Sequence, residues 1–242
     1  MDVIVVEGLT KDYGSKRALA GVSFQVREGS FFGCFGPNGA GKSTLLRILT
    51  GQIRPTSGQA IVLGLDCATQ GIEIKRNVGI VPEVESPPSY LTASEFLWFA
   101  GKVRELDNLD KKVERWLDFF ELQEARGTLC RDLSKGMRQK VMLASAFIHE
   151  PKLLFLDEPF INLDPIYQRK LREYLQGLRE EGRTIFLNSH ILEIAQRLCQ
   201  DVIILHRGRL VAKEDMGSMR ARGEDLEALF MRLVGGEDAR PA

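Results

Sequence analysis

A glycine-rich stretch near residue 40 carries the residue types that hold phosphate. Residues 36–44 read GPNGAGKST, so four residues separate Gly36 from Gly41, Lys42 and Ser43. Glycine lets the backbone turn tightly enough for successive N–H groups to point at one anion. A lysine adds positive charge for β- and γ-phosphates, and a serine hydroxyl can ligate Mg²⁺. The stretch predicts a phosphate site formed by Gly36, Pro37, Asn38, Gly39, Ala40, Gly41, Lys42, Ser43 and Thr44.

Two carboxylates and a histidine follow apolar runs later in the chain. Asp157 and Glu158 come directly after residues 153–156, and His190 follows residues 184–187. Continuous apolar runs are typical of buried parallel strands, and ligands bind at the carboxyl ends of such strands. Asp157 can hold Mg²⁺, Glu158 can polarise a water for attack on a γ-phosphate, and His190 can contact that phosphate or water. Taken singly, Glu158 also fits an acidic residue at the start of a loop, and His190 fits a neighbour of a helix N-cap. Taken together, three strand ends converge on one phosphate, which favours catalysis.

Tyr13 lies in a short polar segment, Lys11-Asp12-Tyr13-Gly14, between two apolar runs. Its ring could stack on a purine, or it could be a half-buried tyrosine of a turn. The residues alone leave both interpretations open.

The surrounding pattern predicts an α/β fold. Phe31–Phe35 is an apolar strand before the glycines, and residues 45–49 are apolar at helical spacing and end before Gly51. A helix that begins at the glycines points its N-terminal dipole at the phosphates. Residues 3–6, 18–26 and 60–63 predict an antiparallel sheet beside this strand.

The pattern changes to helical after Val81-Pro82-Glu83 and the Pro-rich break at residues 86–88. Thr92 and Glu95 form a capping-box pattern, and Asp110 opens a second helix with an apolar face. We expect a helical subdomain over residues 83–135. Its apolar and aromatic residues should mostly pack between the two helices, with one or two left exposed to line a groove; they are Tyr90, Leu91, Phe96, Trp98 and Phe99.

The remaining residues return to strand and helix alternation. Ser134 is a credible N-cap, Pro165 fits a first helical position, and residues 202–212 read as a hairpin around Arg207-Gly208. We therefore expect a nucleotide-binding core over residues 1–82 and 136–234. The polar residues 235–242 read as a flexible tail.

Composition narrows the function classes. The 242 residues carry 33 basic and 33 acidic side chains, which gives no indication of a nucleic-acid surface. The four cysteines are far apart and fit buried small residues in a reducing cytosol. No apolar run approaches the roughly 18 residues of a spanning helix, and no signal peptide opens the sequence. We expect a protein that is soluble by itself and needs a partner for any role at a membrane.

Together these motifs resemble the nucleotide-binding subunit of an ATP-binding cassette (ABC) transporter, from about Val3 to Leu233. GPNGAGKST is similar to the first Walker motif and residues 153–158 to the second. Leu133–Met137 stands where the family has its LSGGQ signature, and His190 resembles the switch histidine. The expected fold is a P-loop NTPase core, with a mixed parallel sheet and an N-terminal antiparallel β-subdomain, plus a helical subdomain.

The resemblance implies ATP and Mg²⁺ as cofactors and a second copy of the subunit as a partner. In the family two cassettes enclose two ATP molecules, and the signature of one contacts the γ-phosphate held by the other. Ser134 and Gly136 would supply that contact, and Asn162-Leu163-Asp164 resembles the D-loop. Tyr13 falls at the adenine-stacking position of the family.

Four residues depart from the family pattern. The signature reads LSKGM, so Lys135 and Met137 replace a glycine and a glutamine. Glu83 stands where glutamine is usual; ionised glutamate only accepts hydrogen bonds, yet it could ligate Mg²⁺ or orient water. Asn162 replaces a small residue. LSKGM with Val-Pro-Glu resembles the branch that pairs with ABC-2-type permeases, most of which export.

The resemblance implies an ATPase that drives a separate integral membrane permease from the cytoplasmic face of the membrane. The branch that it resembles favours export. Two alternatives remain: a soluble ABC-type ATPase that acts on nucleic acid or ribosomes, and a regulatory cassette that does not hydrolyse ATP. Neutral charge and a single cassette without long heptad repeats argue against the first.

Overall fold

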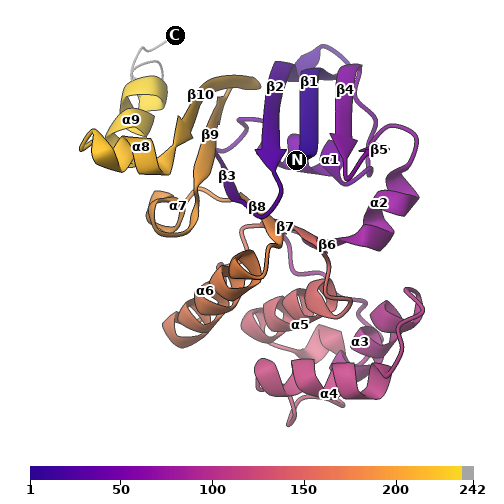
Figure 1. Ribbon diagram of the computed structural model, residues 1–242. Helices are drawn as coiled ribbons and strands as arrows, with labels where there is room; N and C mark the ends of the chain where they lie inside the picture. The colour runs from indigo at the N-terminus through magenta and orange to yellow at the C-terminus, as the bar shows by residue number, and fades with distance from the viewer. Residues whose placement is uncertain (236–242) are drawn as a thin grey trace.

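The computed structural model describes residues 1–235. A six-stranded sheet lies at the centre of the molecule (Figure 1). Its order is β10-β9-β3-β8-β7-β6; five neighbouring strands are parallel, and only β10 runs antiparallel. The strands are β3 (Phe31–Phe35), β6 (Val78–Val81), β7 (Leu153–Asp157), β8 (Thr184–Asn188), β9 (Asp201–His206) and β10 (Arg209–Asp215).

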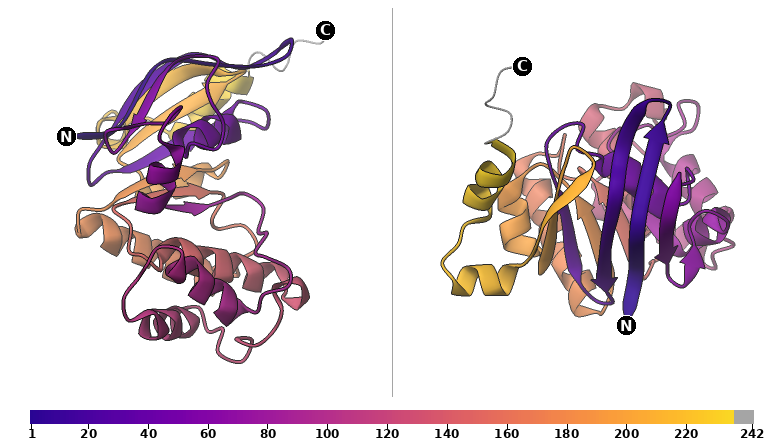
Figure 2. Two further views of the ribbon diagram at one scale, coloured as in Figure 1. Left: turned by 90° about the vertical axis from the view of Figure 1, so that its right-hand side faces the viewer. Right: turned by 90° about the horizontal axis from the view of Figure 1, so that it is seen from above.

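A second, antiparallel sheet lies above the first, as the turned views show (Figure 2). Its order is β2-β1-β4-β5, and every neighbouring pair is antiparallel. It contains β1 (Asp2–Tyr13), β2 (Lys16–Arg27), β4 (Ser57–Val62) and β5 (Leu65–Asp66). The mixed central sheet and the N-terminal antiparallel sheet are both confirmed.

The helices surround the central sheet and extend the molecule away from the antiparallel sheet (Figure 1). They are α1 (Lys42–Leu49), α2 (Gly71–Asn77), α3 (Ala93–Lys102), α4 (Leu109–Phe119), α5 (Lys135–Phe147), α6 (Pro165–Glu180), α7 (Leu192–Leu198), α8 (Met216–Ala221) and α9 (Leu226–Phe230). A 3₁₀ turn spans Cys130–Asp132 and a π-helical turn Met231–Gly235.

Alternation along β3 explains why the central sheet is buried on both faces. Phe31 and Phe35 point into a core shared with α3 to α9, whereas Phe32 and Cys34 point into the core around α1 and the antiparallel sheet. Phe32 stacks on Phe24 of β2, with ring centroids 5.6 Å apart. The strand before the phosphate loop is thereby fixed from both sides.

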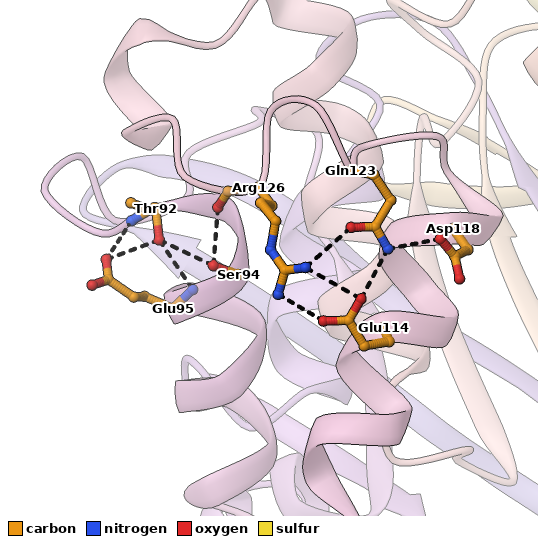
Figure 3. A network of polar contacts seen from close by, with 7 residues as sticks. All are labelled: Thr92, Ser94, Glu95, Glu114, Asp118, Gln123 and Arg126. Carbon is orange, nitrogen blue, oxygen red and sulfur yellow. Dashed lines mark hydrogen bonds and ion pairs between the residues drawn. The ribbon is translucent and has the colours of Figure 1, made fainter.

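The helical end of the molecule is held together by a polar network (Figure 3). The capping box of α3 forms as predicted: the Thr92 hydroxyl accepts from the Glu95 N–H, and the Glu95 carboxylate accepts from the Thr92 N–H. The Arg126 guanidinium pairs with Glu114 of α4, while the Arg126 carbonyl accepts from the Ser94 hydroxyl. Residue 126 therefore connects the start of α3 to α4.

The expected burial of the aromatic stretch is wrong. None of Tyr90, Leu91, Phe96, Trp98 and Phe99 is buried, and Tyr90, Trp98 and Phe99 are 78%, 45% and 53% exposed. The buried stripe of α3 is Ala93, Leu97, Ala100 and Gly101, which follows i, i+4, i+7 and i+8. Trp98 and Phe99 lie one and two residues past Leu97, so they turn off this stripe.

Several other local predictions are confirmed. All four cysteines are free and buried, as expected. The N-cap at Ser134, Pro165 as the first residue of α6 and the β9–β10 hairpin are confirmed. Helices α2 and α8 were not predicted. Residues 236–242 of the expected tail lie outside the described residues, and the expected domain boundaries stay a prediction.

His149, just after α5, is expected to make stability fall with acidity. Its Nε2 lies 3.2 Å from the Val78 carbonyl oxygen, and burial, followed by the nearby Arg104 charge, lowers its pKa to about 4. An unfolded histidine titrates near 6.5, so the unfolded chain binds this proton first as the pH falls from about 6.5 to 4. The free energy of unfolding should drop across that window, by at most about 3 kcal/mol, and level off below it.

The measurement is urea unfolding of the wild type and of His149→Gln at pH 7.5 and pH 5. Gln can still donate to the Val78 carbonyl but does not titrate. The variant should lose less stability than the wild type between the two pH values. Equal losses would contradict a buried, neutral His149.

Candidate nucleotide site

A cavity of about 630 Å³ opens at the carboxyl ends of β3, β7 and β8, which are neighbouring strands. The predicted residues that line it are Tyr13, Asn38, Gly39, Ala40, Gly41, Lys42, Ser43, Thr44, Glu83, Asp157, Glu158 and His190. The structure thus brings these residues together around one cavity, and their roles there stay a prediction. Gly36 and Pro37 belong to the same loop but do not line the cavity wall.

The phosphate loop is shaped by glycine at its junction with α1. Gly41 has a φ of +106°, and a Cβ on it would lie 2.6 Å from the Ala18 carbonyl oxygen of β2. Only glycine fits there. The Lys42 ammonium donates to the carbonyl oxygens of Gly36 and Pro37, at 2.7 and 3.2 Å. Residues 38–44 line the cavity, so the loop offers it the backbone of a tight turn and the Lys42 cation.

Asp157 ends β7 in a buried position. The Asn188 amide donates to it over 2.6 Å, yet burial raises the pKa of Asp157 to about 6. The nearby carboxylates of Glu83 and Glu158 act in the same direction. A cation in the cavity would favour the charged form of this carboxylate.

The donor set fits Mg²⁺ that is shared with a nucleotide. Ser43, Asp157 and Glu83 all line the cavity and offer oxygen atoms. Among residues 1–235, no three His, Cys, Asp or Glu side chains gather into a metal site of their own. Mg²⁺ typically takes one or two carboxylates and completes its shell with water and phosphate oxygens, so the oxygens of Ser43, Asp157 and Glu83 suit it.

Glu158 is held rigidly beside the phosphate loop. It is 7% exposed and has a φ of +48°, and its N–H donates to the Asn188 carbonyl. The Ser189 hydroxyl donates to one carboxylate oxygen over 2.8 Å, and His190 Nδ1 lies 2.6 Å from the other. A left-handed conformation at a non-glycine residue is sparsely populated, and it turns this carboxylate into the cavity. An ionised carboxylate so placed can accept a proton from water.

The opposite wall of the cavity comes from the β1–β2 hairpin. Tyr13 ends β1 and is partly exposed, with the Lys11 ammonium 5.1 Å from its ring centroid. Lys16, Arg17 and Ala18 of β2 also line the cavity, and the sequence analysis missed them. Arg17 pairs with Asp12 at 2.8 Å. Their only signal in the sequence was adjacency to Tyr13, because contact with the phosphate loop depends on how the hairpin packs.

Three further candidate residues, Ser134, Gly136 and Asp164, also lie outside this cavity. Ser134 is exposed and caps α5 by accepting from the Met137 N–H over 3.2 Å. A Cβ on Gly136 would lie 2.8 Å from the Asn162 carbonyl oxygen, so the start of α5 packs against residues 162–164. Asp164 caps α6 by accepting from the N–H groups of Ile166 and Tyr167. The structure thus packs Gly136 against Asn162, two residues before Asp164, and none of the three candidates lines the cavity of the phosphate loop.

A phosphate loop between β3 and α1, with acidic residues at the end of a neighbouring parallel strand, defines a P-loop NTPase fold. Residues 19–161 match the sequence profile of the family described as ABC transporter. The chain belongs to this family.

Relatives and solved structures agree with that assignment. The chain is 36% identical to the Nod factor export ATP-binding protein I of Ralstonia nicotianae, over 96% of this chain and 76% of the relative. It superposes with a TM-score of 0.89 on the ATP-binding subunit of an ABC transporter, at 32% identity over 96% and 99% of the two chains. A dimeric cassette in a post-hydrolysis state, bound to ADP and Pi, gives a TM-score of 0.81 at 25% identity over 88% and 98%.

The chain spans 62% and 63% of the length of two other curated relatives that it matches. No helix within residues 1–235 is long and apolar enough to cross a membrane.

Proposed function

We propose that this chain binds and hydrolyses ATP as the nucleotide-binding subunit of an ABC transporter. The observation that carries the proposal is the Glu158 carboxylate, fixed by Ser189 and His190 and facing the cavity of the phosphate loop. A site that only bound nucleotide would not need a buried carboxylate aimed at the phosphates. The solved cassette with ADP and Pi is a relative in which hydrolysis has taken place.

Each group has a distinct role in the proposed reaction. The N–H groups of the phosphate loop and Lys42 bind the β- and γ-phosphates, and Tyr13 stacks on the adenine. Glu158 orients the attacking water and accepts its proton, while His190 holds Glu158 and contacts the γ-phosphate. Ser43 and Asp157 would hold Mg²⁺, with Glu83 as a further oxygen donor, and the ion would supply positive charge for the phosphate oxygens.

We propose that the active form is a dimer with two ATP molecules at the interface. Ser134 and Gly136 offer a hydroxyl and an N–H at a helix N-terminus, yet they lie outside the cavity of their own chain. In a head-to-tail homodimer they would complete the γ-phosphate site of the other subunit, next to Asp164. Hydrolysis would then remove the contact that holds the two subunits together.

The proposed partner in the membrane is a permease that docks beside the helical subdomain, residues 83–135. A groove of about 180 Å³ lies there, lined by Ile80, Phe96, Phe99, Ala100, Val103, Arg104, Ser145 and Ala146. Phe99 and Val103 are exposed apolar residues at its rim. A short amphipathic helix from the permease would cover them. The subunit would then sit on the cytoplasmic face of the membrane. The name of the Ralstonia relative favours export, and the resemblance carried by LSKGM with Val-Pro-Glu favours an ABC-2-type permease.

Phe99→Ser is expected to weaken capture of the permease about tenfold, because it removes an exposed ring from the groove. The chain is co-expressed with the membrane protein encoded beside its gene, where that protein has about six spanning helices, and co-purification is measured. Trp98→Ser is the matched control, since Trp98 is also exposed but lines a different cavity with Glu95 and Arg126. Equal losses in both variants would contradict docking in this groove.

The function itself is tested by measuring ATP hydrolysis and ATP-dependent dimerisation of the purified chain. Turnover that rises with the square of subunit concentration supports the transporter subunit. Full-speed turnover by a strict monomer would overturn the composite site. Co-purification with ribosomes or nucleic acid favours the soluble ATPase instead, and negligible hydrolysis even with a permease favours a regulatory cassette.

A further inference from the structure

Glu85 joins three segments that the proposed reaction uses, although it lies outside the nucleotide cavity. One carboxylate oxygen is 3.7 Å from Nη2 of Arg138 in α5, and the other accepts from Nδ2 of Asn162 at 3.5 Å. The Glu85 side chain is 11% exposed and that of Arg138 24%. A carboxylate this deeply placed is stable only with partners, so the contact is more than a solvated surface pair.

The two partners of Glu85 are themselves fixed to the proposed dimer contact. Arg138 Nη1 donates to the carbonyl oxygen of Leu133 over 2.6 Å, and Leu133 directly precedes Ser134. Asn162 has a φ of +64°, and its carbonyl oxygen packs so closely against Gly136 that a Cβ there would lie at 2.8 Å. Arg138 thus holds the residue before Ser134, and Asn162 holds the turn beside it.

Glu85 also lies two residues after Glu83, which lines the nucleotide cavity. The loop after β6 therefore has one carboxylate in the cavity and one on the segments that carry Ser134 and Asp164. Any movement of this loop would shift Glu83 in the nucleotide cavity and Glu85 beside the segments that carry Ser134 and Asp164.

We propose that Glu85 is a positioning residue that sets Ser134 and the turn at residues 162–164 for contact with the second subunit. It touches no nucleotide; it acts through Arg138 and Asn162. The inference rests on the proposed function, because it needs ATP turnover by a dimer. It identifies a residue that neither the phosphate loop nor the signature contains.

The test is Glu85→Gln, which keeps the size of the side chain and removes its charge. A lost charge-assisted contact of this kind corresponds to about a tenfold change in an equilibrium. The kcat for ATP should fall about tenfold and ATP-dependent dimerisation should weaken about tenfold, whereas ATP affinity of the monomer should change less than twofold. Glu124→Gln, an exposed carboxylate of the same subdomain, should match the wild type.

A double-mutant cycle separates positioning from mere folding. Arg138→Gln, which also removes the bond to the Leu133 carbonyl, should lower kcat at least as much as Glu85→Gln, and the double variant should fall no further than Arg138→Gln. Glu85→Asp, which restores the charge on a shorter stem, should recover part of the kcat. Additive losses, or a fall in monomer ATP affinity equal to the fall in kcat, would overturn the proposal.

The wild type tells the two proposals apart. A wild type without ATP turnover refutes the proposed function, and this inference with it. If the wild type hydrolyses ATP and Glu85→Gln hydrolyses it equally fast, only the role of Glu85 is refuted.

Discussion

Glu158→Gln should lower ATP turnover about a thousandfold while ATP still binds. A positioned general base typically contributes between about a hundredfold and ten-thousandfold to a rate. Glutamine has the shape of glutamate, so it can still accept from Ser189, whose hydroxyl lies 2.8 Å from the carboxylate. It cannot accept a proton from the attacking water.

Binding should survive because other groups hold the nucleotide. The N–H groups of the phosphate loop and Lys42 face the cavity independently of β7. The variant should therefore bind ATP within a fewfold of the wild type and accumulate as an ATP-bound dimer. Single-turnover kinetics measure the chemical step, and size-exclusion chromatography with ATP measures the dimer.

The matched control is Glu193→Gln, an exposed carboxylate at the start of α7. It should hydrolyse ATP at the wild-type rate. Unchanged hydrolysis in Glu158→Gln would remove Glu158 as the base, and loss of ATP binding would show that the carboxylate has a structural role instead.

The centre of the site was predictable because its residues follow local rules. Glycines before a helix, and acidic residues after a continuous apolar run, can each be interpreted from about ten residues of sequence. The parallel order β3-β8-β7 then brings their ends together. The role of Lys16 and Arg17 as cavity lining was not predictable in this way, because it depends on the packing of the β1–β2 hairpin over Gly41.

The predicted burial of the aromatic stretch was wrong for a related reason. Phe99 is as apolar as Leu97, so composition does not separate the inner face of α3 from its exposed face. The small residues Ala93, Ala100 and Gly101 mark the true inner face, since a Cβ on Gly101 would lie 2.1 Å from Leu109. Close packing between the helices, rather than the position of large apolar residues, decides which face of α3 is buried.

The short helices α2 and α8, of seven and six residues, were missed because a helix this short gives little periodicity. Glu85 was missed for a different reason. Its partners Arg138 and Asn162 are distant in sequence, so their contact appears only once α5 and the turn at residues 162–164 are folded together.

Ser134→Arg should reduce turnover by at least about a hundredfold and leave ATP binding to the monomer intact. Ser134 is exposed and lies outside the cavity of its own chain, so an arginine there has room in the monomer. In the proposed dimer the same side chain would occupy the space of the γ-phosphate contact. A blocked donor of this type typically costs between about a hundredfold and a thousandfold in kcat.

The substitution also removes the N-cap of α5, which costs about 1 kcal/mol of stability. Urea unfolding measures that loss separately, and Ser134→Gly, which costs only a few tenths of a kcal/mol at a cap, shows the effect of losing the hydroxyl alone. Ser218→Arg, at an exposed serine of α8, controls for the added charge.

The informative comparison is a mixture of Ser134→Arg and Glu158→Gln subunits. If Ser134 acts on the other subunit, a mixed dimer has one site with an intact Glu158 and an intact partner Ser134, and the second site carries both defects. Mixing two nearly inactive proteins should then restore part of the turnover. If Ser134 acted within its own chain, every site would carry one defect and the mixture would stay inactive. Loss of monomer ATP binding in Ser134→Arg would likewise contradict a site completed by the second subunit.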